Sequence, residues 1–204
     1  MPHEIVVQNE KGKTMLTLSN VRTALMVVVL SVGLLMMGRG GYIQAKAWLA
    51  QVLIAQAWQQ QTATGIPTKP WSWADTSPIA QLILPNGEQQ TVLAGVSGRN
   101  LAFGPTLQLF TAKPDEQGNV VIYGHNDTHF KSLETAKIGD GIEVQDEYGK
   151  IVRYIVTSVR VVNQQETKVA AQTPWSQLTL ITCYPFITVS VNGPLRWVVT
   201  AIPA

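Results

Sequence analysis

The first apolar pattern along the chain is a run without any charged residue. Residues 23–38 are uncharged, and Arg22 and Arg39 flank them. A helix rises about 1.5 Å per residue, so this run alone is shorter than a hydrocarbon core of about 30 Å. It can cross a membrane when its neighbours extend it and the two arginines reach to the interface. The pattern predicts a transmembrane signal anchor over 21–41.

Two other interpretations of this run stay open. Residues 45–47 read Ala-Lys-Ala, a weak small-x-small site at which a signal peptide could be cleaved. The run could also be a buried helix of a soluble protein. Three basic residues precede it and two follow it. This bias favours a cytoplasmic tail over 1–20 and places the rest of the chain outside the cytoplasm.

A helical pattern continues after the predicted anchor. The segment is rich in Ala, Leu and Gln, which are good helix formers. Gly65 and Pro67 are expected to end this helix. We therefore predict a juxtamembrane helix over 42–64, which can be continuous with the anchor. Its apolar residues recur at three- and four-residue steps: Ile43, Ala47, Ala50, Ile54 and Ala57.

The pattern changes to short strands from Ile79 onward. Residues 68–82 form a linker with Trp71 and Trp73, and we expect these tryptophans to pack rather than face water. Pro85-Asn86-Gly87 is a hairpin signal between two strands. Seven or eight short strands separated by turns predict an all-β barrel or sandwich with short connecting helices, over 65–204. The apolar runs lie at 79–84, 89–95, 119–124, 141–146, 150–163, 177–183 and 196–202.

The net charge of the chain is confined to its N-terminal part. The chain has a formal net charge of +2. Residues 1–41 carry that excess, because residues 42–204 contain eleven basic and eleven acidic side chains. A domain that binds nucleic acid normally has a basic surplus, so we exclude that class of function.

Cys183 is the only cysteine of the chain and ends one of the predicted strands. An odd cysteine in an extracytoplasmic domain is a candidate for a reactive thiol. A cysteine nucleophile needs a base or cation, a proton donor for the leaving group and donors for the oxyanion. The histidine and arginine candidates after the predicted anchor are few: His125, His129, Arg99, Arg153, Arg160 and Arg196.

Cys183 and two of these candidates lie at ends of predicted strands. His125 follows one strand, Cys183 ends another, and Arg196 begins a third. If these strands are neighbours, the three side chains meet at one rim. Alternatives stay open: Cys183 could be a buried core residue, Arg196 a solvated strand end, and His125, His129 and Cys183 with Asp127 a metal site.

The residues around Cys183 resemble a known family. The sequence TLITC at 179–183 matches the T-L-x-T-C motif of sortases, the bacterial cysteine transpeptidases. The upstream YGHNDTHF at 123–130 is similar to their histidine segment. Arg196 follows the cysteine by 13 residues, at the distance of their arginine. The three motifs occur in the family's order, and the resemblance covers roughly 68–202.

Further segments resemble one branch of that family, the class GN sortases of Gram-negative bacteria. They are KPWSWADTSPIAQL at 69–82, AFGP at 102–105 and the GH-x-DTHF pattern. Asn126 departs from that branch, which more often has arginine there. The departure could alter loop charge or substrate preference, but it removes none of the three catalytic residue types.

The resemblance implies a fold and a mechanism. It implies an eight-stranded β-barrel in which Cys183 attacks a carbonyl of an LPxTG-like, C-terminal sorting signal and forms a thioester. His125 would protonate the departing amine and then activate the incoming one, and Arg196 would bind the substrate carbonyl. Supporting or substrate-binding roles are expected, with packing or solvated roles as alternatives, for Thr182, Asp127, His129, Tyr184 and Pro185.

The resemblance also implies partners and a location. The partners are the membrane, a secreted protein with a sorting signal and an amine acceptor whose identity the sequence does not give. No cofactor or metal is expected. The location is the inner cell membrane, with a single-pass anchor, a cytoplasmic N-terminus and a periplasmic catalytic domain. The alternatives are a cysteine hydrolase or protease on the same site, or a non-enzymatic membrane-anchored β-domain.

Overall fold

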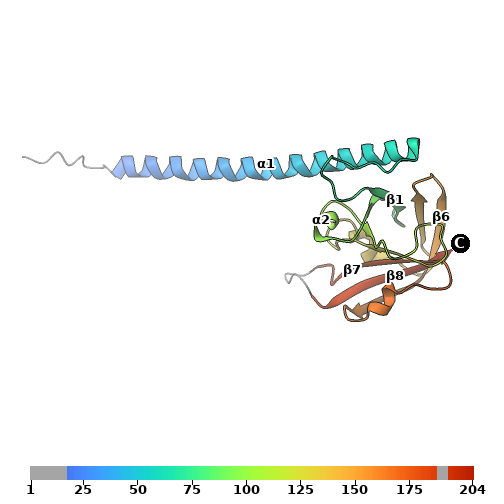
Figure 1. The fold of residues 1–204 in the computed structure, drawn as a ribbon. Coiled ribbons are helices and arrows are strands. Elements are labelled where there is room, and N and C mark those ends of the chain that lie inside the picture. Colours follow the sequence, from blue (N-terminus) through green and yellow to red (C-terminus); the bar gives the residue numbers. More distant parts are fainter. Residues whose placement is uncertain (1–17, 188–192) are drawn as a thin grey trace, which may run out of the picture. The chain divides into compact units, whose positions relative to one another are not determined.

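One long helix, α1, spans Leu18–Thr64 (Figure 1). The computed structural model describes residues 18–187 and 193–204. The predicted tail over 1–20 therefore falls almost wholly outside the described residues. The chain divides into two compact units, Met1–Lys46 and Ala47–Ala204. Both the predicted anchor and the predicted juxtamembrane segment belong to α1, which is one uninterrupted helix in the described part of the chain.

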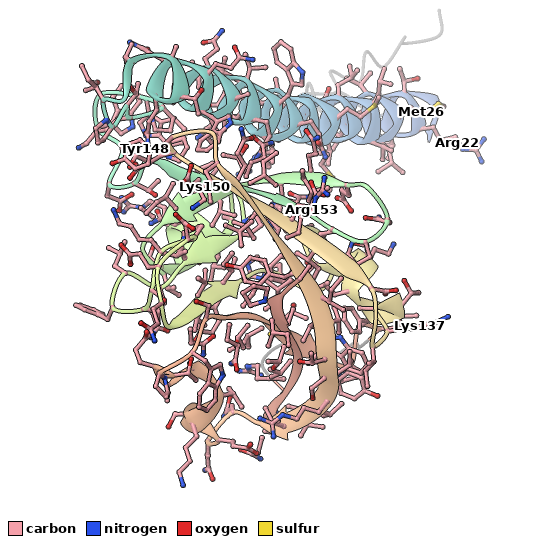
Figure 2. The ribbon with its side chains drawn as sticks, turned by 90° about the vertical axis from the view of Figure 1, so that its right-hand side faces the viewer. Arg22, Met26, Lys137, Tyr148, Lys150 and Arg153 are labelled. Carbon is pink, nitrogen blue, oxygen red and sulfur yellow. The ribbon has the colours of Figure 1, made fainter. Side chains whose placement is uncertain are left out.

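The N-terminal part of α1 is apolar on all sides. Its most apolar stretch has a mean hydropathy of 2.0, and none of that stretch is buried. Met26, for example, is 66 % exposed and lies one turn beyond Arg22 (Figure 2). In the part of the chain that the structure describes, this is the single helix long and apolar enough to cross a membrane.

The C-terminal part of α1 belongs to the second unit and has a buried stripe. Gln51 Nε2 donates to the Phe103 carbonyl at 2.7 Å, and Gln61 Nε2 donates to Glu147 Oε2 at 3.0 Å. These bonds tie the helix to the β-domain. The buried residues of the stripe are Ala50, Ile54, Ala57, Trp58 and Gln61, which confirms three- and four-residue spacing for this half of the helix.

The rest of the second unit is a closed β-barrel (Figure 1). The strand order is β1-β2-β3-β4-β7-β8-β6-β5, and β1 pairs with β5 to close it. The predicted eight-stranded barrel is confirmed, and the sandwich alternative is wrong. The strands are β1 Pro78–Ile83, β2 Gln89–Ala94, β3 Thr106–Leu107, β4 Asn119–Tyr123, β5 Gly141–Asp146, β6 Ile151–Asn163, β7 Gln177–Tyr184 and β8 Leu195–Pro203.

Short helices connect the strands, as the sequence predicted. They are α2 at Gly98–Leu101, η1 at Lys131–Thr135 and η2 at Thr167–Ala170. The predicted hairpin joins β1 to β2, with Gly87 at a φ of 83°, a conformation that glycine adopts without steric strain. Trp71 packs edge-on against Phe103 with ring centroids 5.3 Å apart. The prediction for Trp73 is wrong, because its side chain is 81 % exposed.

The barrel has two apolar clusters on opposite faces of its wall. The interior cluster fills the barrel with aliphatic residues and with Phe130 and Tyr154. A smaller cluster lies on the outer face of β4, β6, β7 and β8, where the connection from β6 to β7 packs on it through Val169 and Ala170. The four buried members of this outer cluster are Val121, Val162, Ile181 and Val198. The wall is therefore apolar on both faces along these strands.

Burial of Tyr154 in the barrel predicts a loss of stability at high pH. Burial, and then the charge of Asp115, raise the pKa of Tyr154 from 10.0 to about 12. The unfolded chain ionises first, so stability that is fully present below pH 10 is lost as pH rises toward 12, by about 2–3 kcal/mol.

Thermal unfolding of the full chain in detergent checks this at pH 9 and pH 11.5. Between pH 9 and pH 11.5, wild type should lose about 2 kcal/mol of stability relative to Tyr154→Phe. A difference that does not change with pH would contradict the assignment.

Candidate active site

Cys183 and Arg196 lie opposite each other on neighbouring strands. β7 and β8 are antiparallel, and Cys183 pairs directly with Arg196. Directly opposed residues in an antiparallel pair point to the same face of a sheet. One pair earlier, Thr182 opposes Trp197, and both of these side chains point to the interior face. The half-exposed thiol and the guanidinium therefore share the outer face.

His125 reaches the same outer face from β4. β4 and β7 are parallel neighbours, with Tyr123 beside Ile181. The Gly124 N–H donates to the Ile181 carbonyl at 3.2 Å, so the pairing continues one residue past β4. His125 is two residues beyond Tyr123, just as Cys183 is two residues beyond Ile181. The alternation of side chains therefore places His125 beside Cys183 on the outer face.

Two side-chain hydrogen bonds also join the segment that carries His125 to the end of β7. The buried Thr182 Oγ1 donates to the Gly124 carbonyl at 2.7 Å. Asn126 Nδ2 donates to the Pro185 carbonyl at 2.9 Å. Gly124 and Asn126, the two neighbours of His125 in sequence, are thus bonded to Thr182 and Pro185, which lie just before and after the Cys183–Tyr184 end of β7. These bonds fix the position of the His125 backbone relative to the Cys183 backbone.

The loop after His125 closes over a buried phenylalanine. The Phe130 N–H donates to the His125 carbonyl at 2.9 Å, and Phe130 is fully buried. A Cβ added at Gly124 would lie 2.8 Å from the Phe130 ring, so the ring packs directly on the glycine backbone. Phe130 is therefore a packing residue of this loop.

His129 and Asp127 belong to the same loop but are not bonded to the thiol. His129 is half-buried, and its Nδ1 lies 3.4 Å from Thr128 Oγ1. Burial and the nearby His125 lower the pKa of His129, whereas Asp127 and Glu88 oppose this shift. His129 therefore favours the neutral form at pH 7. Asp127 is exposed and acts on His129 through its charge.

Arg196 is held by three hydrogen bonds on one side of its guanidinium. Nη1 donates to the carbonyls of Gly193 and Leu195 at 2.7 and 2.8 Å. Nη2 donates to Gln164 Oε1 at 2.8 Å. A guanidinium has five N–H donors, so among the described residues Nε–H and one hydrogen of Nη2 have no acceptor and can bind a substrate.

Tyr184 and Pro185 begin the connection after Cys183. The Tyr184 ring stacks on Trp197 with centroids 5.7 Å apart, and Phe186 packs edge-on against both rings. Trp197 Nε1 donates to the Leu133 carbonyl at 3.0 Å. These aromatic rings cap one end of the barrel interior. Pro185 is exposed and contributes its carbonyl to the bond with Asn126.

A groove runs on the outer face beside these residues. It encloses about 330 Å³, and its apolar floor includes Tyr123, Ile181 and Val162. Arg196 and Gln164 line it, and η2 with the rest of the β6–β7 connection forms a wall. Gln164 could not be found from the sequence, because a loop glutamine has no motif of its own. Tyr123 begins the segment 123–130, but nothing in that motif marks its ring as part of a groove.

These groups could support acyl transfer. A thiol, an imidazole and a guanidinium at neighbouring strand ends supply a nucleophile, an acid-base group and an oxyanion donor. A metal-dependent arrangement has no support in the geometry: within residues 18–187 and 193–204, no three His, Cys, Asp or Glu side chains gather as ligands.

Comparison with known proteins identifies the family. The model of the sortase domain matches residues 84–204, which include all three candidate residues. The chain belongs to the sortase family. Sortase D of Bacillus subtilis (strain 168) is 33 % identical over 87 residues. That match covers 42 % of this chain, and the chain spans 43 % of the length of that relative.

Solved sortase structures have the same fold. Sortase A from Corynebacterium diphtheriae is 30 % identical, with a TM-score of 0.57 over 65 % of this chain and 63 % of that chain. A Clostridium perfringens sortase D5 transpeptidase is 22 % identical, with a TM-score of 0.57 over 72 % of this chain and 88 % of that one. The predicted sortase-type barrel is thus confirmed.

The bond from Thr182 to Gly124 predicts a specific effect of mutation. Thr182→Val leaves the buried Gly124 carbonyl without its donor, so unfolding should become easier by about 1–3 kcal/mol. Any acyl-transfer activity should fall as well, because His125 directly follows Gly124. Thr182→Ser keeps the hydroxyl and serves as the matched control. Thermal unfolding and peptide turnover of the full chain measure both effects; equal values for the valine and serine variants would refute the role.

Proposed function

We propose that this chain is a membrane-anchored cysteine transpeptidase that acts on LPxTG-like, C-terminal sorting signals. The observation that supports the proposal most directly is the register of the strands. Cys183 is paired with Arg196 across β7 and β8, His125 follows the end of β4 beside β7, and Arg196 lines the adjoining groove. Membership in the sortase family supports this assignment of roles.

The first half of the reaction forms a thioester. The Cys183 sulfur, as a thiolate, attacks the scissile carbonyl carbon, and negative charge develops on the carbonyl oxygen. The two free donors of Arg196 stabilise this oxyanion. The C–N bond then breaks while the His125 imidazolium gives its proton to the departing amine. The acyl group remains on sulfur.

The second half transfers the acyl group to a new amine. Neutral His125 accepts a proton from the incoming amine, whose nitrogen attacks the thioester carbonyl. The C–S bond breaks, the thiolate is regenerated, and one amide bond has been exchanged for another. Hydrolysis follows the same path with water as acceptor. Product analysis with and without an added amine therefore separates a transpeptidase from a cysteine hydrolase.

The finer assignments concern subclass, partners and location. Class GN membership is supported by the segments 69–82 and 102–105 and by the loop that begins at His125. The apolar part of α1 supports a single-pass anchor in the inner membrane, with a cytoplasmic N-terminus and a periplasmic barrel. The proposed partners are a secreted protein with a sorting signal and an amine acceptor. A shared membrane surface raises the effective concentration of enzyme and substrate.

The roles of the three residues predict distinct kinetic losses. Mass spectrometry of the full chain in detergent, mixed with an LPxTG-type peptide, should show an acyl adduct on Cys183 that added triglycine converts to ligated peptide. Cys183→Ala should give neither species. His125→Ala and Arg196→Ala should each slow turnover on the order of 10²- to 10⁴-fold.

A remote variant supplies the control for these losses. Tyr148 is an exposed aromatic residue in the turn between β5 and β6 (Figure 2), and Tyr148→Ala should keep wild-type turnover. Ligated product from Cys183→Ala would rule out the thioester mechanism. Adducts that water resolves but triglycine does not would identify a hydrolase.

The bond between Gln164 and Arg196 predicts a change in kcat. Gln164→Glu places a carboxylate against the guanidinium and partly neutralises the charge offered to the oxyanion. We expect kcat to fall about tenfold with little change in KM, because the loss is greatest where oxyanion charge develops. Gln164→Ala tests removal of the bond without added charge and should lose less. Steady-state kinetics distinguish these outcomes; a higher KM at unchanged kcat would show that Gln164 acts in ground-state binding instead.

A further inference from the structure

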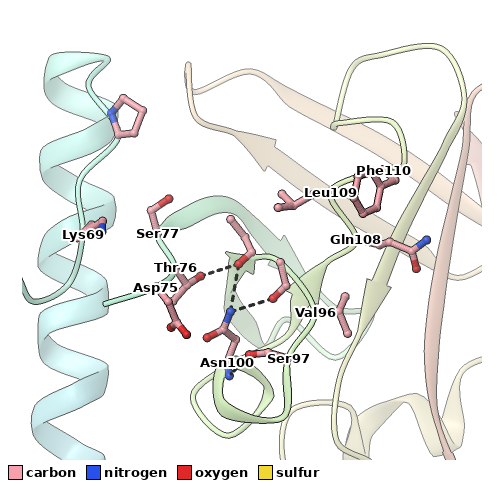
Figure 3. A pocket seen from close by; sticks show the side chains of 13 residues that line it. Lys69, Asp75, Thr76, Ser77, Val96, Ser97, Asn100, Gln108, Leu109 and Phe110 are labelled. Atoms are coloured by element: carbon pink, nitrogen blue, oxygen red, sulfur yellow. Dashed lines mark hydrogen bonds between the residues drawn. The ribbon is translucent and has the colours of Figure 1, made fainter. Parts of the chain in front are cut away.

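A second hollow lies on the outside of the barrel, next to the active-site groove. It encloses about 630 Å³ between the linker 67–77, the end of β2 with α2, and the start of the β3–β4 connection (Figure 3). None of the three catalytic candidates lines it. Gln108 lines both the hollow and the active-site groove, so the two spaces adjoin at this residue.

Asn100 provides an unused hydrogen-bond acceptor at this hollow. The residue is 4 % exposed, and its Nδ2 donates to the carbonyls of Ala94 and Gly95 at 3.3 and 3.0 Å (Figure 3). Its Oδ1 is buried and has no partner. A buried acceptor without a partner is costly. Asn100 lines the hollow, so a donor on a ligand bound there is a candidate partner for this oxygen.

Gln108 provides an unused donor at the junction of the two spaces. Its Oε1 accepts a hydrogen bond from the Tyr123 hydroxyl at 3.0 Å. No described residue accepts from its Nε2, so this amide hydrogen is available. An acceptor at Asn100 and a donor at Gln108 complement the N–H and C=O groups of an extended peptide.

The rim of the hollow is apolar and carries little net charge. Phe110 is 93 % exposed, and Leu109 and Val96 beside it are also exposed. An exposed apolar cluster at the edge of a polar hollow is typical of a binding site. Lys69 also lines the hollow, and Asp75, which lines it as well, is ion-paired with Arg99 at 3.3 Å. A phosphate-bearing ligand would need more cations, so the surface favours a neutral chain with an apolar side chain.

We propose that this hollow binds a segment of the cargo polypeptide that flanks the sorting motif. This inference rests on the proposed function and adds a subsite to it. One backbone N–H of the flank bonds to Asn100, one carbonyl bonds to Gln108, and one apolar side chain packs against Phe110. The enzyme therefore recognises cargo residues that flank the sorting motif as well as the motif itself.

The test uses LPxTG-type peptides with three randomised residues on each side of the motif. The full chain in detergent reacts with this pool, and mass spectrometry sequences the adducts on Cys183 and the released fragments. Wild type should enrich a large apolar residue at one flanking position on the order of tenfold. Phe110→Ala, which removes an exposed ring, should abolish most of the enrichment. Tyr148→Ala, which also removes an exposed ring, should keep it.

A change in the peptide tests the backbone bonds without changing the protein. N-methylation of the flanking amide in the selected peptide should lower kcat/KM by about five- to tenfold in wild type. Methylation of an amide farther from the motif should have no effect. Equal rates for all these peptides would overturn the proposed bond to Asn100.

The outcomes separate this inference from the proposed function. Adducts without a flanking preference, or with one that Phe110→Ala leaves intact, overturn the subsite while the transpeptidase mechanism stands. If Phe110→Ala changes only the use of the amine acceptor, the hollow holds the acceptor and the inference is wrong. If no peptide forms an adduct on Cys183, the proposed function fails and the subsite fails with it.

Discussion

The candidate active site depends on the pairing of β7 with its two neighbours. A parallel ladder to β4 and an antiparallel ladder to β8 bring three distant parts of the chain side by side. Side chains alternate between faces with a period of two, so a slip of one residue in either ladder would move a functional side chain to the interior. Burial on both faces of β7 specifies this register: Leu178 and Leu180 pack inside the barrel, and Ile181 packs outside.

The two faces of this wall explain the neighbouring roles of Thr182 and Cys183. Thr182 points inward, and its hydroxyl donates a hydrogen bond to the Gly124 carbonyl, so this hydroxyl has a structural role. Cys183 points outward, where the groove lies. The candidate nucleophile and the bond that holds the segment of the candidate acid-base residue can thus be adjacent in sequence without competing for space. A second hydrogen bond, from Asn126 to the Pro185 carbonyl, also links the two segments. Asn126 is the residue that departs from the class GN pattern to which the sequence was compared.

Much of the fold could be predicted from sequence because the barrel strands follow simple rules. Turn residues such as Gly87 and apolar runs such as the one ending at Cys183 are local signals, and the strands they predicted are present. β3 was missed because Thr106–Leu107 is too short to show a period. Trp73 was misjudged because burial of a linker residue depends on tertiary contacts. The outer groove could not be foreseen either, since Gln108, Tyr123 and Gln164 come together only through the strand order and the β6–β7 connection.

The central claim is that a substrate peptide lies along the outer face over β4 and β7, with its scissile carbonyl between Cys183 and Arg196. A crystal structure of the protein with a thiol-bearing substrate analogue joined to Cys183 by a disulfide tests this most directly. We predict that the peptide lies in the groove lined by Tyr123 and Ile181. The carbonyl oxygen should lie within about 3 Å of an Arg196 nitrogen. A peptide that leaves this groove empty, or a guanidinium that still faces only Gln164 and the backbone, would contradict the account.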